Sequence, residues 1–569
     1  MLHQSFKETV RYLSRRNTPM PRGRFESLDE RCMLSVNVEL LADINPGAAS
    51  ALVNSRDWAE LDGFLYFTAD DGISGSELWR TDGTEAGTSL VADINDLIPQ
   101  DPFALEDSLG SFPFGLTLFN DEIYFAAQNE DGDELWKTDG TDAGTTLVAD
   151  INPGFADAFP FALTVFRDEL YFGATTDELG DELWKTDGTE AGTVMVADIE
   201  PGAGSSFPTE MYVFNDELFF SASEFGDVEL WKTDGTEAGT VRVSDIHPGE
   251  TLPSFPEGFF EFQNELYFIA ADDITPDGFL ASHLYKTDGT EAGTVRVADE
   301  RLTVNFTDES PNVVEFNDQL YFGGIDAFGQ WELYRTTGTP GESELVVDLA
   351  GNISGTVSDM AVLDGELYFA ANDESGRQLW RTNGELGAAN VSERLTSVEF
   401  EIVSTIGGVM QTDNIGAFPT ELFEHNGEIF FNAHDGETYQ VWRTSGGEIE
   451  TVTDFIDNAT SAFTSNFFEF DDRIFFRGSG DEGLELWSLE VIEPLVPPPV
   501  LLDGDTDGNG RVEFADFLVI SRNFGQDVSS RAEGDLDGNG RVEFADFLLL
   551  SQNFGNQIEE IFAIEQDWF

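Results

Sequence analysis

The stretch ELWKTDGTEAGT occurs at residues 182–193 and again, letter for letter, at 229–240. Close variants stand at 77–88, 134–145 and 283–294. The aromatic residue of this string recurs further along the chain, and the whole series is Trp79, Trp136, Trp184, Trp231, Tyr285, Tyr334, Trp380, Trp442 and Trp487. The steps between these residues are mostly near 45 to 50 residues, a period typical of four-stranded propeller blades.

One unit, residues 159–202, shows what each repeat contains. It holds four short β-type runs, FALTVF, ELYFGA, ELWKT and TVMVADI. Arg167 and Asp168 separate the first two runs. Asp187 and Gly188 lie between the last two, where glycine accepts the positive φ of a tight turn. Four strands joined by hairpins form one antiparallel blade.

The two ends of the repeat region are complementary. The last unit stops at ELWSLEVIEP without an outer strand, whereas an unattached outer-strand string, VELLADINPG, stands at 38–47 before the first unit. We therefore expect the N-terminal strand to complete the last blade, which removes the free sheet edges. The fold class predicted for 38–493 is mainly β, a closed β-propeller of eight or nine four-stranded blades. The units around Trp380 and Trp442 are candidates for an atypical blade, and 391–416 reads as an insertion.

The recurrence of the string indicates a structural role. A ligand motif needs to occur once or a few times, whereas a packing or turn motif must recur in every unit. We therefore expect the repeated Leu and Trp to pack between blades, and TDGT and AGT to form the turn into the outer strand. These strings resemble the ELWxxDGT repeat family over nearly all of 38–493, and the match weakens after the fifth unit. That family is known mainly from exported bacterial proteins and implies no particular reaction.

The composition limits the partners. The chain has 28 basic and 110 acidic residues and a formal net charge of −82, so it repels nucleic acid phosphates and anionic lipid surfaces. Such a charge fits either a solvated surface in salty surroundings or cation binding. The single cysteine, Cys32, excludes an internal disulfide. From this charge we expect no nucleic acid partner. No apolar run approaches the roughly 18–20 residues that cross a bilayer, so we also expect no membrane span.

The N-terminal segment, residues 1–37, differs from the rest in charge. Its basic residues are Lys7, Arg11, Arg15, Arg16, Arg22, Arg24 and Arg31. A basic leader suggests targeting, although the apolar region of an ordinary signal peptide is missing. The stretch RFESLDERCMLS at 24–35 resembles the LEPR-XLL-type motif of large exported bacterial proteins, with Glu30 in place of its Pro and Met33 in place of a Leu. This resemblance implies export, and the predicted location is secreted or at the cell surface.

Two near-copies follow a Pro-rich linker at 494–502. They are GDTDGNGRVEFADFLVISRNFG at 504–525 and GDLDGNGRVEFADFLLLSQNFG at 534–555. Each fits a twelve-residue calcium loop, in which alternate residues direct oxygen ligands at one ion. The predicted ligands are Asp505, Asp507, Asn509, Arg511, Glu513 and Asp516 in the first loop and Asp535, Asp537, Asn539, Arg541, Glu543 and Asp546 in the second. Arg511 and Arg541 would use their backbone carbonyls, and two Ca²⁺ ions are expected.

A helix is predicted after each loop. The first carries Phe514, Phe517, Leu518 and Ile520 on an apolar side and ends at Gly525. Position 12 is Asp rather than Glu, and PPPVLL before the first loop cannot form a helix. A duplicated loop and helix of this kind resembles the type I dockerin family over 503–555. An acidic tail, 556–569, follows.

The dockerin resemblance implies calcium binding and a cohesin-like protein as partner, or another surface or matrix protein. In that family, loop positions 10 and 11 commonly contact the partner. Here these positions hold Phe514-Ala515 and Phe544-Ala545 rather than the usual small hydroxylic pair. The two phenylalanines have either a partner-binding role or a core-packing role.

No catalytic residues are assigned. None of the five histidines belongs to a metal pair such as HExxH, and neither a GxSxG elbow nor a phosphate-cradling loop is present. A glycosidase needs only two carboxylates, which leaves that activity open. The sequence favours a non-catalytic, exported propeller with a calcium-loaded docking module. The alternative is a dockerin-borne carbohydrate-active protein, a glycoside hydrolase or polysaccharide-binding protein, with its site in the propeller.

Overall fold

The computed structural model describes residues 35–492 with short gaps and longer ones at 96–109, 302–312, 350–356 and 454–463, and it describes both helices and parts of the loops within 506–553. The described chain divides into two compact units, one within Val36–Glu490 and one within Val491–Phe569. Among the described helices, none has the length and apolar character to cross a membrane.

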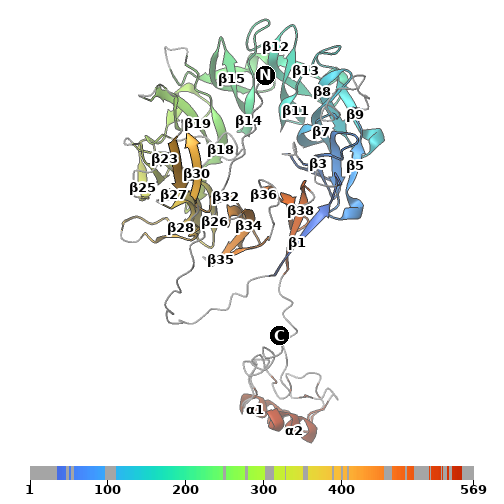
Figure 1. Cartoon of the computed structure of the whole chain (residues 1–569), viewed down its shortest axis with the longest axis vertical. Helices are drawn as coiled ribbons and strands as arrows, with labels where there is room; N and C mark the ends of the chain where they lie inside the picture. The colour runs from blue at the N-terminus through green and yellow to red at the C-terminus, as the bar shows by residue number, and fades with distance from the viewer. Residues whose placement is uncertain are drawn as a thin grey trace. The chain divides into compact units, whose positions relative to one another are not determined.

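The larger unit is a propeller that contains, in its described residues, nine four-stranded blades around a central axis (Figure 1). The first three blades are β2 (Ala59–Leu61), β3 (Phe64–Asp70), β4 (Ser76–Thr81) and β5 (Ser89–Ala92); β6 (Phe114–Phe119), β7 (Glu122–Asn129), β8 (Gly132–Thr138) and β9 (Thr146–Ala149); and β10 (Phe161–Phe166), β11 (Glu169–Thr176), β12 (Gly180–Thr186) and β13 (Val194–Ala197). The four strands expected in 159–202 are therefore confirmed.

The next three blades repeat the same order of strands. They are β14 (Thr209–Phe214), β15 (Glu217–Glu224), β16 (Asp227–Thr233) and β17 (Val241–Ser244); β18 (Glu257–Phe262), β19 (Glu265–Ile274), β20 (Leu280–Thr287) and β21 (Val295–Arg296); and β22 (Val313–Phe316), β23 (Gln319–Ile325), β24 (Trp331–Thr336) and β25 (Ser343–Val347). The first strands of successive blades contact one another, as β10 does with β6 and β14. These strands therefore lie nearest the axis, where the blades converge.

The last three blades are also four-stranded. They are β26 (Val357–Leu363), β27 (Glu366–Asp373), β28 (Gly376–Thr382) and β29 (Ser392–Arg394); β32 (Thr420–His425), β33 (Glu428–His434), β34 (Tyr439–Ser445) and β35 (Glu448–Thr451); and β36 (Thr464–Phe470), β37 (Arg473–Gly480), β38 (Gly483–Ile492) and β1 (Ser35–Ala42). The units around Trp380 and Trp442 thus form complete blades, which corrects the expectation that one of them is atypical. The extra residues between them form the hairpin of β30 (Glu401–Ile406) and β31 (Val409–Asn414), whereas the start of 391–416 belongs to β29.

The antiparallel order gives the propeller two chemically distinct faces. The start of each first strand pairs near the end of the second, as Phe161 does with Gly173. The linkers between blades and the loops from second to third strand therefore share one face, which we call the linker face. The turns after the first and third strands, including Asp187-Gly188, lie on the opposite face, which we call the turn face.

The ELW string packs between blades. Leu183 belongs to a buried cluster with Phe220 of the next blade. Trp184 packs against a cluster that contains Leu135 of the preceding blade. Successive side chains of a strand point to opposite sides of the sheet, so this one dipeptide contacts both neighbouring blades.

The TDGTEAGT string forms a fully bonded turn. Asp187 Oδ1 accepts hydrogen bonds from Thr189 N at 3.0 Å and from Thr189 Oγ1 at 2.6 Å, and Gly192 N donates to Thr189 Oγ1 at 3.1 Å. Gly188 has a φ of +90°, and a Cβ there would lie 2.4 Å from the Tyr124 hydroxyl of the preceding blade. The string therefore shapes the turn and allows close contact between blades.

The N-terminal strand closes the ring. β1 pairs with β38 as the fourth strand of the last blade, so the expected closure is confirmed, although the strand begins at Ser35 rather than at 38. Ile44 N donates to Glu485 Oε2 at 3.1 Å across 441 residues of sequence. The same bond joins Ile199 N to Glu182 Oε2 at 2.7 Å within the third blade. In the last blade, the segment after the N-terminal strand therefore forms the hydrogen bond that another blade forms with the segment after its own fourth strand.

The smaller unit contains, in its described part, the helices α1 (Phe514–Asn523) and α2 (Phe544–Asn553). Its buried cluster consists of Val512, Ile520, Leu536, Val542 and Leu550. Each repeat contributes residues to this cluster, so the two loop-helix repeats pack as one unit.

Candidate calcium and docking site

The last predicted ligand of each calcium loop is buried in the first turn of a helix. Asp516 and Asp546 both have 0% exposure. Asp516 Oδ1 accepts hydrogen bonds from Thr506 N at 2.7 Å and Thr506 Oγ1 at 2.9 Å. Asp546 accepts from Leu536 N at 2.7 Å and from Glu543 N at 2.8 Å. These bonds hold the second position of each loop beside its twelfth, which is the closure that a twelve-residue calcium loop requires.

The other predicted ligands are described in part. Asp535, at the first position of the second loop, is 6% exposed, whereas Arg541 and Glu543 are exposed. The remaining predicted ligands lie outside the described residues, and they are Asp505, Asp507, Asn509, Arg511, Glu513, Asp537 and Asn539. The structure thus places Asp535 and Asp546 where the two ends of the second loop meet, and Asp516 at the equivalent place in the first loop.

The described residues fit a calcium ion. Burying a carboxylate costs several kcal/mol unless donors or a cation compensate it, and Asp516, Asp535 and Asp546 are all buried. Their ligand atoms are hard carboxylate oxygens, which Ca²⁺ prefers. Asp516 would hold an ion in the first loop, and Asp535 and Asp546 would hold one in the second, each with predicted ligands outside the described part.

Two phenylalanines at the helix starts face solvent. Phe514 and Phe544 are each 62% exposed, at equivalent positions of the two repeats. Each ring stacks on the next aromatic residue of its own helix, with centroids 5.6 Å apart for Phe514 and Phe517. Ile520 is buried, but Leu518 is 36% exposed. The core-packing role considered for Phe514 and Phe544 is therefore wrong, and the expected apolar side of the helix is narrower than predicted.

The glutamate of the ELW string has a buried, hydrogen-bonding role in the blade that the sequence did not predict. Glu182 is fully buried and accepts hydrogen bonds from Ile199 N at 2.7 Å, Glu200 N at 3.1 Å and Ser206 Oγ at 2.8 Å. It thereby ties its blade to the linker that follows. Burial nevertheless raises its pKa to about 7. The other members of this set are Glu77, Glu134, Glu229, Glu332 and Glu485, whose pKa values burial raises to about 7, or about 8 for Glu134.

These glutamates predict an unusual pH dependence of stability. The pKa values of these glutamates in the folded state lie above the ordinary value of 4.5. At a pH between the unfolded and the folded pKa, the folded state therefore binds more protons than the unfolded state. The stabilisation that these glutamates contribute to the folded state is complete below about pH 4.5 and is lost as the pH rises through about 7. We therefore expect the propeller to melt at a higher temperature at pH 5 than at pH 8, which calorimetry at constant calcium would measure.

The chain itself supplies the variant for this test. Gln378 and Gln440 occupy the glutamate position in the seventh and eighth blades, and Gln378 Nε2 donates to the linker carbonyl of Val398 at 2.8 Å. Glu182→Gln should therefore raise the melting temperature at pH 8 and leave it unchanged at pH 5. Glu190→Gln, on an exposed turn, is the control. Equal melting temperatures at pH 5 and pH 8 would contradict the prediction.

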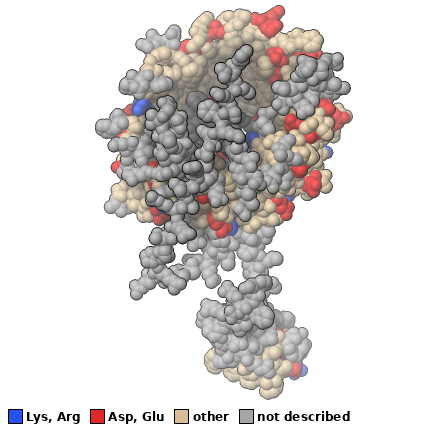
Figure 2. All heavy atoms as spheres, in the orientation of Figure 1, with Lys and Arg blue, Asp and Glu red and all other residues tan. Residues whose placement is uncertain are grey.

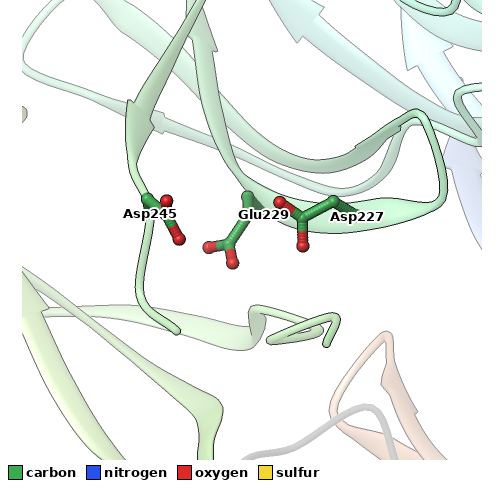
Figure 3. A group of neighbouring side chains, drawn as sticks. All are labelled: Asp227, Glu229 and Asp245. Carbon is green, nitrogen blue, oxygen red and sulfur yellow. The ribbon is translucent and has the colours of Figure 1, made fainter. Parts of the chain in front are cut away.

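The fourth blade gathers three carboxylates, Asp227, Glu229 and Asp245 (Figure 3), whose ligand atoms lie within 4.8 Å of one another. Arg242 Nη2 lies 2.9 Å from Asp227 Oδ2, 3.3 Å from Asp245 Oδ1 and 3.6 Å from Glu229 Oε1. The guanidinium already supplies the positive charge that a metal ion would bring. We interpret the cluster as an internal ion-pair network.

The fifth blade replaces the buried glutamate with His283. The Asp272 carboxylate lies 2.5 Å from His283 Nδ1 and accepts a hydrogen bond from the Tyr285 hydroxyl at 2.5 Å, and Arg296 Nη1 lies 3.3 Å away. Burial would raise the pKa of Asp272, but the bonds from His283 and Tyr285 and the nearby charges outweigh it, so that pKa is lowered. The aspartate therefore stays ionised and bonded, which makes it a structural acceptor rather than an acid.

The Dockerin type I domain model matches residues 503–555. No protein of curated function matches the chain. Similar solved structures include a puromycin hydrolase, with 15% identity, a TM-score of 0.34 and coverage of 65% of this chain and 59% of that one. Another is the β-propeller domain of the Trilobed protease from Pyrococcus furiosus, with 12% identity, a TM-score of 0.27 and coverage of 61% and 98%. The chain thus spans about three fifths of the hydrolase, and these values identify neither an activity nor a substrate.

Proposed function

We propose that the protein is an exported, calcium-binding docking protein, in which residues 503–555 attach a non-catalytic propeller to a cohesin-like partner at the cell surface or in the extracellular matrix. The observation that carries the proposal is the exposure of Phe514 and Phe544 at equivalent positions of two near-identical repeats. The family match supports it, because dockerin domains generally bind cohesins.

The exposed phenylalanines are suited to anchor a partner. Large aromatic side chains dominate binding energies when they enter a pocket on the partner, and a solvent-facing ring gains by burial there. The loop bonds of Asp516 and Asp546 fix the start of each helix and thus the position of the rings. Two bound Ca²⁺ ions, one per loop, would make this surface depend on calcium.

Export and the absence of catalysis complete the proposal. Residues 1–37 are proposed as the export segment on their basic composition and motif, and all of them before Ser35 lie outside the described residues. A non-catalytic propeller is supported by the acidic clusters of the fourth and fifth blades, in which Arg242 and His283 pair with the carboxylates.

The docking prediction concerns the double variant Phe514→Ala, Phe544→Ala. We expect it to lose at least about tenfold in affinity for a purified type I cohesin domain in the presence of calcium. The reason is that burying one aromatic side chain contributes about 1.5–3 kcal/mol. Isothermal titration of the full chain would measure the change, and Phe524→Ala, which removes another exposed ring just after α1, is the control.

Two outcomes would contradict the docking function. The first is unchanged affinity in the double variant. The second is that no cohesin domain of a representative panel binds the wild-type chain. Release of reducing sugar from a polysaccharide panel would instead favour the carbohydrate-active alternative.

A further inference from the structure

Five linkers between blades reach the first strand of the next blade through a small residue followed by Phe-Pro. The phenylalanines are Phe112, Phe159, Phe207, Phe255 and Phe418, and all five have positive φ values between 44° and 50°. A bulky residue rarely adopts this left-handed conformation, which costs on the order of 1–3 kcal/mol. The fold repeats this strain in each of these five linkers, so the position of the rings needs a reason.

Four of the five strained rings are exposed to solvent, and Phe112 is half-buried. Phe159, Phe207, Phe255 and Phe418 are 50%, 57%, 46% and 38% exposed. A hydrogen bond to the preceding blade fixes the backbone, since Phe159 N donates to the Asp133 carbonyl at 3.1 Å. Burial in the core therefore does not explain the left-handed conformation.

More apolar side chains lie exposed on the same face. Ile73 and Phe225 are 80% and 75% exposed in loops between second and third strands, and Phe155 is 92% exposed in a linker. Together with the Phe-Pro rings they make the linker face aromatic. Exposed apolar groups gathered in this way mark interaction surfaces.

Basic side chains near both faces are already paired with carboxylates. The basic residue after the ELW aromatic lies near the turn face and pairs with a glutamate there, as Lys137 does with Glu122 and Lys185 with Glu169, each at 2.9 Å. Near the linker face, four described arginines also pair with carboxylates of their own blades, and these are Arg242, Arg296, Arg377 and Arg394. On the side of the ring seen in Figure 2, acidic side chains are scattered over the described surface, with few basic ones between them.

Carboxylates stand beside the exposed rings. Glu200 accepts a hydrogen bond from the Phe225 amide, and Glu210 accepts one from Gly258 N at 3.0 Å, next to the Phe255-Pro segment. Burial, followed by the nearby charge of Glu210, raises the pKa of Glu257 to about 7. A partner that brings positive charge would relieve this repulsion.

One Phe-Pro ring already shows the chemistry of such a contact. The guanidinium carbon of Arg377 lies 5.3 Å from the centroid of Phe418. The same guanidinium forms an ion pair with the buried Asp359. Stacking on an aromatic ring and pairing with a carboxylate are therefore compatible at this position of the repeat.

We propose that the linker face binds a cationic polypeptide segment, rich in arginine and carrying apolar side chains, whose guanidinium groups stack on Phe159, Phe207 and Phe255 beside the neighbouring carboxylates. This is a second partner site, separate from the proposed docking function of 503–555. The surrounding negative charge repels an anionic polymer. A neutral polysaccharide would use the rings but gain nothing from the carboxylates.

The test uses the full chain in calcium and a fluorescein-labelled peptide of eight alternating Arg and Leu residues. Fluorescence anisotropy should show saturable binding that weakens as sodium chloride rises. The triple variant Phe159→Gly, Phe207→Gly, Phe255→Gly should bind about tenfold more weakly, since each cation–π contact contributes only a fraction of a kcal/mol to about 1 kcal/mol. Glycine accepts a positive φ, so this variant should melt no lower than the wild type.

A matched control changes three exposed apolar residues of outer strands, away from the linker face. Val194, Val241 and Leu345 are 42%, 41% and 45% exposed, and their replacement by Ala should leave binding unchanged. Equal binding by both triple variants would overturn the proposal, because overall charge alone would then explain the affinity. So would Phe-dependent binding of neutral cellohexaose without binding of the peptide. If the glycine variant melts lower, the single variants should each lose about twofold, and no loss in any of them would also overturn it.

Discussion

Chelation of calcium is expected to unfold α1 and α2 and to leave the propeller intact. The physical reason lies in Asp516 and Asp546, which are fully buried in a unit whose buried apolar cluster consists of Val512, Ile520, Leu536, Val542 and Leu550. This cluster is small, and a core of that size contributes little stability without a metal or a crosslink. The backbone donors on each aspartate compensate part of the cost of burial, and a divalent ion would supply the rest.

Hydrogen exchange of the full chain measures this separately for each unit. Amides of Phe514–Asn523 and Phe544–Asn553 should be protected with calcium and should exchange as an unfolded chain with chelator. Stabilisation should grow as the logarithm of calcium concentration, by about 2.7 kcal/mol at one hundred times the dissociation constant. Propeller amides should change little, because the core between blades is apolar.

The variants Asp516→Asn and Asp546→Asn should together abolish the calcium response. Each keeps the size of the side chain and an acceptor oxygen but removes the charge that favours the ion. Glu533→Gln, an exposed position outside the predicted ligands, is the control. Protection of both helices in chelator, or calcium-dependent protection in the double variant, would show that the assigned loops do not govern folding.

The propeller was predictable because its signals are repeated. The ELW aromatic marks one strand in each blade, and Asp187-Gly188 marks a turn whose geometry only a few residue types allow. The closing strand was predictable for the same reason, since VELLADINPG carries the string of an outer strand without the rest of a blade. The sequence alone leaves eight or nine blades open, because nine exceeds the common range of about four to eight and the units around Trp380 and Trp442 are candidates for an atypical blade. Strand pairing shows that both blades are complete.

The site was predictable only where spacing alone defines it. Loop spacing predicts Asp516 and Asp546 as ligands, and the structure shows both buried and bonded to their own loops. The exposure of Phe514 depends instead on which side of the helix the second repeat covers, and this is a tertiary property. The buried role of Glu182 was hidden because glutamate is ordinarily a surface residue, and only its linker bonds reveal its burial. The Phe-Pro segments were equally visible in the sequence, but their left-handed backbone was not.

Removal of β1 should destabilise the whole ring, since a closed propeller depends on its last blade. Without residues 35–42, the β38 edge loses its partner strand, and an unpaired edge is prone to pair with another chain. Leu41 is 6% exposed and packs in a cluster with Phe67 of the first blade and Phe475 of the last. The strand therefore joins the two ends of the ring by packing as well as by hydrogen bonds.

A point variant tests closure without shortening the chain. Leu41→Ala with Ile44→Ala removes two buried side chains from the junction, and each such truncation costs about 2–5 kcal/mol. We expect a clearly lower melting temperature, and for the 35–42 deletion also concentration-dependent aggregation, both measurable by calorimetry and light scattering. Glu39→Gln, on the exposed side of the same strand, should melt like the wild type. If the deletion and the double variant both melted at the wild-type temperature, closure by β1 would have no role in stability. The contacts of this N-terminal segment with Glu485 and the first blade would then add nothing to the stability that the remaining eight blades provide.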